Sequence, residues 1–269
     1  GFFGQIYKSY PNPQETMFPI SVTILTKNSE KHLEKLLAIL REFDEVLICD
    51  TGSVDCTLEI AAAFSNVRIE KSVFQGFGPT HNEASQLAKH DWIFSLDSDE
   101  IPSPELLAEM RNFPLQKGCV GSFPRKNFYH NKWIWGCGWY PDRVVRLYNR
   151  TETQFSPEQV HEAVQCHGLE VRLFQGPLLH YSYDTVADFL QKMQIYTKLF
   201  AEQNHGKRSS SIFKAILHGC FAFVKSYLWK GGLFLGVEGF EISLYNANTA
   251  FYKYLKLREA NQQKKRSDE

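Results

Sequence analysis

The sequence is poor in cysteine and has no CxxC pair. Its six cysteines are spread from Cys49 to Cys220, and several lie in apolar runs. This distribution indicates neither a zinc site nor a disulfide framework. No signal peptide is recognisable, so we expect a cytoplasmic protein in a reducing compartment.

Net charge is also lacking, because 30 Lys and Arg balance 30 Asp and Glu. A neutral chain gives no general argument for nucleic acid, and we expect no such partner. The balance conceals an asymmetry: residues 206–269 carry 11 basic and 5 acidic side chains, against 19 and 25 in the rest. The basic end is either a solvated tail or a surface for a partner.

Long apolar runs are missing as well. The longest charge-free run within residues 210–235 is "AILHGCFAFV" (215–224), which is too short to cross a bilayer. Aromatic and lysine side chains alternate around it, so it is either a helix packed on the core or an amphipathic helix at a membrane surface. The basic C-terminal helices are therefore candidates for peripheral contact with a membrane surface.

What the chain does have is an alternation of short β-branched runs and helical leucine spacing. The apolar and charged contents, 43% and 22%, are those of a globular protein. Ser29 precedes the first leucine-rich stretch and suits a helix cap. Strands are predicted at 19–26, 45–50, 67–72 and 92–97, and helices at about 30–43, 57–64, 77–90 and 104–113.

Strands and helices in this order predict βαβ units and a mostly parallel sheet flanked by helices, an α/β fold. Right-handed crossovers bring the carboxyl ends of all strands to one edge, where ligands bind in open parallel sheets. We expect six polar residues to converge there: Thr26, Lys27, Asn28, Asp50, Asp97 and Asp99.

The stretch "FSLDSDE" (94–100) places carboxylates directly after an apolar run. Asp97 and Asp99 offer hard oxygen ligands that suit Mg²⁺ or Mn²⁺, and such ions are usually shared with substrate phosphates. The alternative is a solvated turn that caps the next helix. Asp50 ends a neighbouring strand in the same way, which favours the binding site.

The second half of the chain differs from the first. Strands with aromatic loops are predicted up to about residue 183, and helices dominate from 184 onward. We expect a leader at 1–18, a catalytic domain at 19–183 (a donor half at 19–104 and an acceptor half at 105–183), and a helical region at 184–269.

Four ordered blocks carry a family resemblance. The stretches "SVTILTKNSEKHLEKLL", "EVLICDTGSVDCTLEIA" and "GFGPTHNEASQLAKHDWIFSLDSDE" resemble the donor-binding half of family 2 glycosyltransferases, which are inverting enzymes of the GT-A fold. The later stretches "GWYPDRVVRLYNR", "QVHEAV" and "LLHYSY" resemble more narrowly the bacterial lipopolysaccharide core β-1,4-glucosyltransferases.

The resemblance implies roles for single positions in donor binding. Thr26 and Asn28 would contact uridine, Asp50 the uracil or ribose, and Asp97 the ribose or sugar. The remaining positions that match are Asp55, His81 and Asn82. His81 stands where relatives often carry a basic residue, so its charge near neutral pH is open.

The resemblance also implies a metal, Mg²⁺ or Mn²⁺, held on the donor diphosphate by Asp99 and Asp97, with His180 as a further ligand. His180 has a structural alternative as a hydrogen-bonded residue after an apolar run. An inverting transfer needs a base for the acceptor hydroxyl. The candidates are Glu162 first, Asp142 beside two aromatic residues second, and His161 next to Glu162 in a run read as a short strand.

The function expected is transfer of a hexose, glucose from UDP-glucose, to an inner-core heptose of a lipid-linked saccharide. A metal-dependent phosphohydrolase is one alternative, but it would leave Asp50 and the "TKN" block without a task. A non-catalytic module that binds nucleotide sugars is the other.

Overall fold

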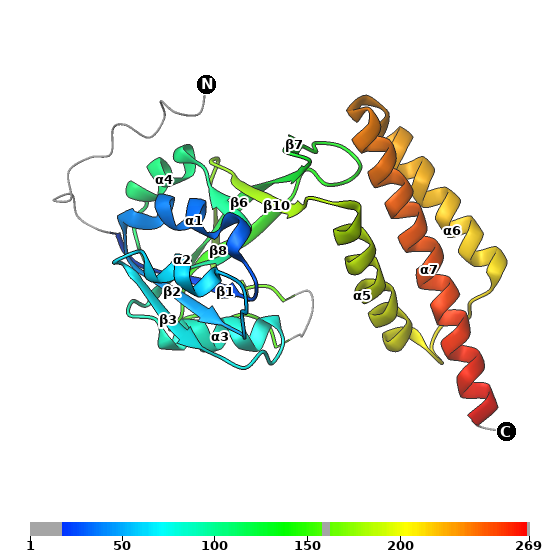
Figure 1. Ribbon diagram of the computed structural model, residues 1–269, viewed down its shortest axis with the longest axis horizontal. Coiled ribbons are helices and arrows are strands. Elements are labelled where there is room, and N and C mark those ends of the chain that lie inside the picture. Colours follow the sequence, from blue (N-terminus) through cyan, green and yellow to red (C-terminus); the bar gives the residue numbers. More distant parts are fainter. Residues whose placement is uncertain (1–17, 158–161, 268–269) are drawn as a thin grey trace. The chain divides into compact units, whose positions relative to one another are not determined.

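The computed structural model describes residues 18–157 and 162–267, with side chains to residue 263. The leader expected at 1–18 lies outside the described residues except for Phe18. The described chain forms two compact units (Figure 1). The first comprises the residues up to Phe123 and Val144–Gly176, and the second comprises Pro124–Arg143 and Pro177–Glu269.

The first unit is an α/β layer structure. Its elements are β1 (Phe18–Thr26), α1 (Glu30–Ile39), η1 (Leu40–Glu42), β2 (Phe43–Asp50), α2 (Thr57–Ala62), β3 (Val67–Lys71), α3 (Phe77–Leu87), β4 (Trp92–Asp97), β5 (Glu100–Pro102), α4 (Pro104–Arg111) and β9 (Glu170–Leu173). Two strands cross the unit boundary, β6 (Cys119–Tyr129) and β8 (Arg143–Asn149).

The strands follow the order β3-β2-β1-β4-β8. The first four are parallel, and β8 pairs antiparallel with β4. All four predicted strands are present within two residues of their expected ends. The predicted α/β fold of the GT-A type, with a mostly parallel sheet at its centre, is confirmed.

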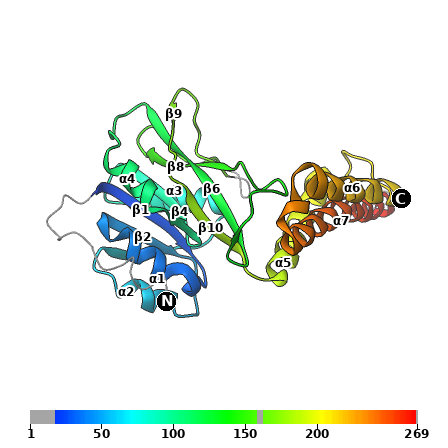
Figure 2. The same cartoon turned by 90° about the horizontal axis from the view of Figure 1, so that it is seen from above.

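Helices cover both faces of this sheet. The helices α1 and α2 lie on one side of β1 and β2 together with α4, whose Arg111 pairs with Glu42 of η1, and α3 lies on the other (Figures 1 and 2). Because side chains alternate along a strand, Leu47, Cys49 and Ile93 point to the α3 side and pack with Ala84. The leucines predicted at helical spacing are buried in α1 and its last turn.

The second unit combines a small sheet with helices. The end of β6 pairs with β7 (Lys132–Trp133) and β10 (Leu178–Tyr183). The helical elements are α5 (Val186–Asn204), α6 (Ile212–Val224), the π-helical η2 (Lys225–Trp229), the 3-10 turn η3 (Gly232–Leu235) and α7 (Val237–Ser267). The helices α5 and α6 both pack on α7. The helices predicted from residue 184 onward are therefore present.

One detail of the helix prediction is wrong. Ser29 does occupy the position before α1, but its side chain makes no capping hydrogen bond to that helix. Its hydroxyl instead accepts a bond from Ser98 at 3.0 Å, so it links two loops. The described residues contain no helix long and apolar enough to cross a membrane.

Candidate functional site

The carboxyl ends of β1, β2 and β4 meet at one edge of the first unit. Thr26 is opposite Asp50 in the register of β1 and β2, and Leu25 is opposite Asp97 in the register of β1 and β4. The polar residues that the topology predicted at this edge are therefore brought together, although they lie up to 71 positions apart in the sequence.

Asp50 organises the loop that follows β2. Its carboxylate accepts hydrogen bonds from the Thr26 hydroxyl and from the backbone N–H groups of Gly52 and Ser53, each at 3.0 Å. A fourth bond comes from the Ser53 hydroxyl at 2.5 Å. Burial alone would raise the pKa of Asp50, but these donors outweigh it and lower the pKa below its usual value. Asp50 is thus a buried, ionised carboxylate at the ligand-facing edge.

Asn28 and Asp55 join the loops after β1 and β2. The backbone N–H of Asn28 donates to the Ser53 hydroxyl at 2.9 Å, and the Asn28 side-chain oxygen accepts from the backbone of Val54 at 2.9 Å. Asn28 has a positive φ of 54°, which asparagine tolerates better than most residues. The Asp55 carboxylate accepts from the Thr57 hydroxyl and backbone at the start of α2. The "TKN" block therefore shapes this loop.

The "DSD" turn is tied to the same loops. Ser98, between the two aspartates, donates to Ser29 after β1 at 3.0 Å. Asp97 and Asp99 are both half-buried. Three loops from separate strands form one hydrogen-bonded surface, and it displays carboxylates.

A buried arginine holds the first aspartate of this turn. Arg146, on β8, pairs with Asp97 and donates to the Glu100 carboxylate at 2.9 Å. Its side chain is 7% exposed and that of Glu100 is 0% exposed. Burial alone would lower the pKa of Arg146, but the carboxylates of Asp97 and Glu100 raise it above its usual value.

From the sequence alone, Arg146 in "RVVRLYN" could either bind acceptor phosphate or lie on a solvent face. The side chain is instead buried beneath the "DSD" turn. Arg146 and Asp97 lie 49 positions apart in the sequence, so no local sequence pattern predicts their contact.

His81 is neutral at physiological pH. It is 1% exposed, its Nδ1 is 3.1 Å from the Ser95 hydroxyl, and its ring stacks on Phe155 with centroids 4.5 Å apart. Burial lowers the pKa of His81 to about 3, and the nearby charge of Arg146 contributes to that shift. Of the two charge states that the sequence left open for His81, this burial favours the neutral one.

The side chain of Asn82 forms two hydrogen bonds to the backbone of Phe155, in the stretch that precedes the candidate base Glu162. Its side-chain amide donates to the Phe155 carbonyl at 3.0 Å and accepts from the Phe155 N–H at 2.9 Å. Phe155 forms an isolated antiparallel bridge with Val164. Glu162, two residues before Val164, is half-buried and lies outside the helices and strands. His161 lies outside the described residues.

A second polar network belongs to the second unit. Asp142 accepts from Arg125 Nε at 2.8 Å and from the Asn127 amide nitrogen at 3.1 Å. That nitrogen also donates to the Trp139 carbonyl, so the Asn127 oxygen must face His180 Nδ1, 2.6 Å away. An amide oxygen only accepts, so His180 donates to it from a protonated Nδ1.

The predicted metal ligands are distributed over both units. Asp97 and Asp99 belong to the first and His180 to the second. Across residues 18–157 and 162–267, no group of three or more His, Cys, Asp or Glu side chains is placed to hold a metal ion.

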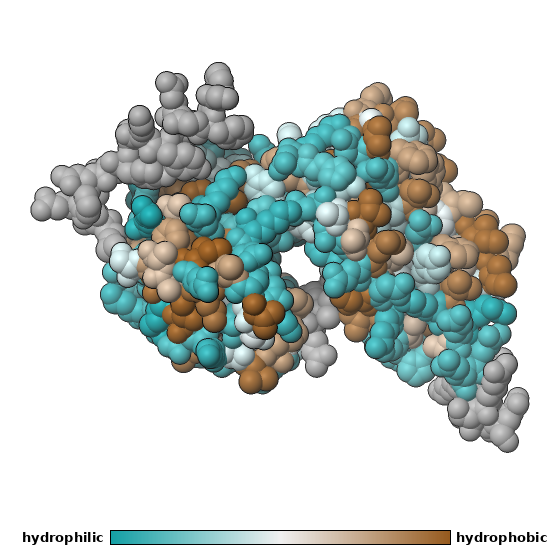
Figure 3. All heavy atoms as spheres, viewed as in Figure 1, coloured by the Kyte–Doolittle hydropathy of each residue, from teal (hydrophilic) through white to brown (hydrophobic). Residues whose placement is uncertain are grey.

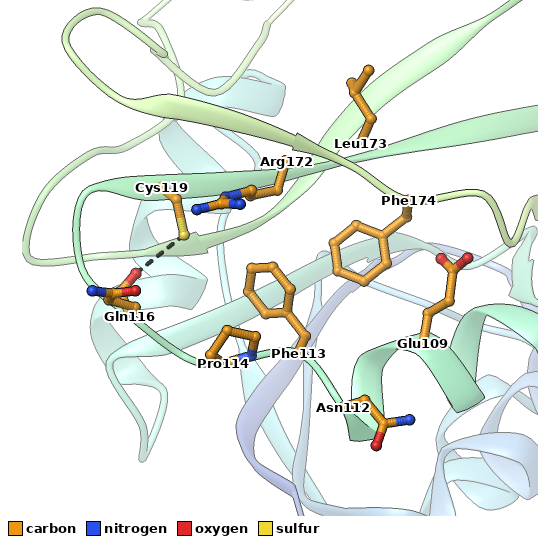
Figure 4. A pocket seen from close by; sticks show the side chains of 9 residues that line it. All are labelled: Glu109, Asn112, Phe113, Pro114, Gln116, Cys119, Arg172, Leu173 and Phe174. Atoms are coloured by element: carbon orange, nitrogen blue, oxygen red, sulfur yellow. Dashed lines mark hydrogen bonds between the residues drawn. The ribbon is translucent and has the colours of Figure 1, made fainter.

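A cavity of about 420 Å³ lies elsewhere in the first unit (Figure 4). Phe113 and Phe174 line it with rings that are in contact, their centroids 5.1 Å apart, and Arg172 and Glu109 line it as well. The Phe113 ring is 6.4 Å from that of Trp92, the first residue of β4. The cavity is therefore near the amino end of β4, away from Asp97, and is not part of the candidate site.

A model of one enzyme family spans this edge. The model of glycosyl transferase family 2 matches residues 21–174, which include all three loops of this edge. The chain belongs to glycosyl transferase family 2. This glycosyltransferase thus has its ligand-facing edge inside the segment that defines the family.

Relatives extend the likeness along the chain. This glycosyltransferase is 26% identical over 258 residues to the lipopolysaccharide core biosynthesis glycosyltransferase LpsC of Rhizobium meliloti, covering 89% of this chain and 92% of that protein. It is 24% identical over 258 residues to the uncharacterized glycosyltransferase RT0209 of Rickettsia typhi, covering 90% of this chain and 88% of that protein.

Solved structures with similarity include a Staphylococcus aureus protein, TarS 1-349, in complex with UDP-GlcNAc. It is 14% identical, with a TM-score of 0.44 and 92% of each chain covered. Glucosyl-3-phosphoglycerate synthase from Mycobacterium tuberculosis, in complex with Mn²⁺, UDP and phosphoglyceric acid, is 25% identical with a TM-score of 0.31, covering 41% of this chain and 43% of that one. Neither adds to the family assignment.

Proposed function

We propose that this glycosyltransferase moves glucose from UDP-glucose to an inner-core heptose of a lipopolysaccharide, with inversion at the transferred carbon. The convergence of Asp50, Asp97 and Asp99 at the carboxyl edge of the parallel sheet carries the proposal. The near full-length likeness to LpsC supports the lipopolysaccharide acceptor. The resemblance noted in the sequence supports the choice of glucose and UDP.

The donor would lie over the loops after β1, β2 and β4. Asn28, Asp50 and Asp55 are fixed in these loops by hydrogen bonds within the protein, so the surface that meets uridine is preformed. A preformed surface loses less conformational entropy when the ligand binds. Within this proposal Asp50 acts chiefly by shaping the loop, because its four lone-pair sites already accept hydrogen bonds.

The residues present fit a divalent metal. Asp97 and Asp99 supply hard oxygen ligands, and Arg146 pairs with Asp97 from beneath. Bound Mg²⁺ or Mn²⁺ would supply positive charge to the diphosphate as it leaves.

Glu162 is the better candidate for the base that accepts the acceptor's proton. The Asp142 carboxylate is already engaged by Arg125 and Asn127. Glu162 lies two residues before Val164, which forms a bridge with Phe155, and Asn82 holds Phe155 by two hydrogen bonds. Such anchoring holds a catalytic carboxylate near one position, which general base catalysis requires.

The test is isothermal titration of UDP with and without Mn²⁺ on the wild type, on Asp99→Asn, and on a matched control, Asp91→Asn. Asp91 precedes β4 and pairs with Arg150 near the other end of the strand. We expect Mn²⁺-dependent binding that is lost in Asp99→Asn and kept in Asp91→Asn. Absence of UDP binding under every condition would refute the proposal.

Turnover separates the remaining alternatives. UDP-glucose is incubated with heptose-containing core lipid, and transfer is followed by mass spectrometry. Release of phosphate without transfer would point to a phosphohydrolase, and binding without any turnover to a non-catalytic module. Glu162→Gln is expected to bind UDP normally and to transfer at least a hundredfold more slowly, since general base catalysis typically contributes about 10²–10⁴-fold.

A further inference from the structure

The second unit exposes an unusual amount of apolar surface along α6, η2 and η3. Phe213 is 70% exposed, Trp229 66% and Phe234 75%. Figure 3 shows hydrophobic side chains gathered over these elements. We name this surface the apolar ridge; its members are Phe213, Ile216, Leu217, Phe221, Leu228, Trp229, Leu233, Phe234 and Val237, all exposed. Large contiguous patches of this kind mark interaction sites.

Packing within the unit does not account for the ridge. The helix α6 meets α7 through its small residues, Ala215 and Gly219, which are buried. A Cβ built on Gly219 would lie 3.3 Å from the Ala247 carbonyl oxygen, so this face of α6 is already in close contact. The ridge residues Phe213, Leu217 and Phe221 recur every four positions and form a separate stripe.

The ridge is bordered by positive charge. Between Glu202 and Glu238 the sequence has no acidic residue but has five basic ones: Lys207, Arg208, Lys214, Lys225 and Lys230. Lys225 and Lys230 are exposed. Glu238, the first acidic residue after the ridge, pairs with Lys132 at 2.9 Å, so its charge is compensated.

We propose that the apolar ridge rests on a lipid bilayer that contains anionic headgroups. Phenylalanine and leucine side chains would enter the boundary of the acyl chains, Trp229 would lie at headgroup level, and the lysines would face lipid phosphates. The charge of the ridge favours this occupant over a second copy of the chain, because two basic ridges would repel each other. The inference goes beyond the proposed function and holds whichever sugar is transferred.

The expected strength follows from the same residues. Each cation near an anionic surface strengthens binding about fivefold, so Lys225→Gln/Lys230→Gln is expected to weaken it about 25-fold. Each fully inserted phenylalanine contributes about tenfold or more, so Phe213→Ser/Phe234→Ser is expected to weaken it at least a hundredfold. Salt is expected to weaken the binding of the wild type, because it screens the charges.

The experiment is flotation of the full chain with phosphatidylcholine vesicles that contain either no phosphatidylglycerol or about a third of it. The matched control is Leu173→Ser, an apolar residue 61% exposed on β9 of the first unit. Circular dichroism confirms that each variant is folded. Binding to the anionic vesicles that is lost in the ridge variants and kept in Leu173→Ser would establish the proposal.

Cysteine labelling gives a second measurement. Cys220 on α6 and Cys56 in the first unit are both exposed. An environment-sensitive dye on Cys220 is expected to shift to the blue with anionic vesicles, whereas the same dye on Cys56 is not. The two labels are compared in variants where the other cysteine and Cys166 are replaced by serine.

Three outcomes would overturn the proposal. The first is wild-type protein that does not float with anionic vesicles at low salt. The second is binding that the ridge variants leave unchanged. The third is a dimer, seen by sedimentation equilibrium, that the ridge variants convert to monomer, because the ridge would then face a second copy of the chain.

Discussion

Replacing Arg146 with methionine should destabilise the first unit more than any other single change at the candidate site. The guanidinium balances Glu100, whose side chain is 0% exposed, at 2.9 Å. Removing one partner of a buried pair leaves the other as an uncompensated buried charge, which costs about 3–5 kcal/mol. Asp97 contributes little to this cost, because its side chain is 37% exposed and water can solvate it.

The expected order of variants tests that reasoning. Arg146→Met is expected to lower the free energy of unfolding by about 3–5 kcal/mol, and Asp97→Asn by about 0–1 kcal/mol. The double variant Arg146→Met/Glu100→Met is expected to recover most of the loss, since apolar replacements of a buried pair are often neutral.

Urea unfolding followed by circular dichroism measures these differences. Hydrogen exchange of the β4 amides assigns them to the first unit, which matters because a chain of two units need not unfold in one step. An Arg146→Met protein within about 1 kcal/mol of the wild type would refute the reasoning, and so would a double variant no more stable than the single one.

Three further predictions concern neighbouring residues. The pKa of His81 is about 3 in the folded state and about 6.5 in the unfolded state, so between these pH values only the unfolded state binds this proton. The free energy of unfolding should therefore fall by up to about 1.4 kcal/mol for each pH unit below pH 6.5. His81→Gln should flatten that slope in urea titrations at a series of pH values. Asn82→Ala should lower the rate of transfer at saturating donor and leave the dissociation constant for UDP within about twofold, because Asn82 acts through the Glu162 segment; an equal loss of both would contradict this role. Gly176→Ala should cost about 1–3 kcal/mol in the same unfolding assay, because its Cβ would lie 2.3 Å from the Leu106 backbone nitrogen, and a variant as stable as the wild type would show that this contact can relax.

The sequence determined the framework of this protein. Apolar runs of β-branched residues alternating with leucines at helical spacing were enough to predict β1 to β4 and their parallel order, because short crossovers permit few topologies. That order in turn places Asp50, Asp97 and Asp99 at one edge of the sheet. The local chemistry of turns also explains why Asn28 and Asp55 lie where they do.

Only the tertiary structure decided what several of these side chains do. Arg146 looked like a surface residue in an alternating strand, but packing of β8 beside β4 buries it under Asp97. The neutral state of His81 follows from burial against Phe155, and the proton position on His180 follows from the orientation of Asn127. These properties depend on burial and on partners distant in the sequence. A residue's own segment fixes its place in a strand or turn, whereas its charge state and partners are fixed by the segments that pack around it.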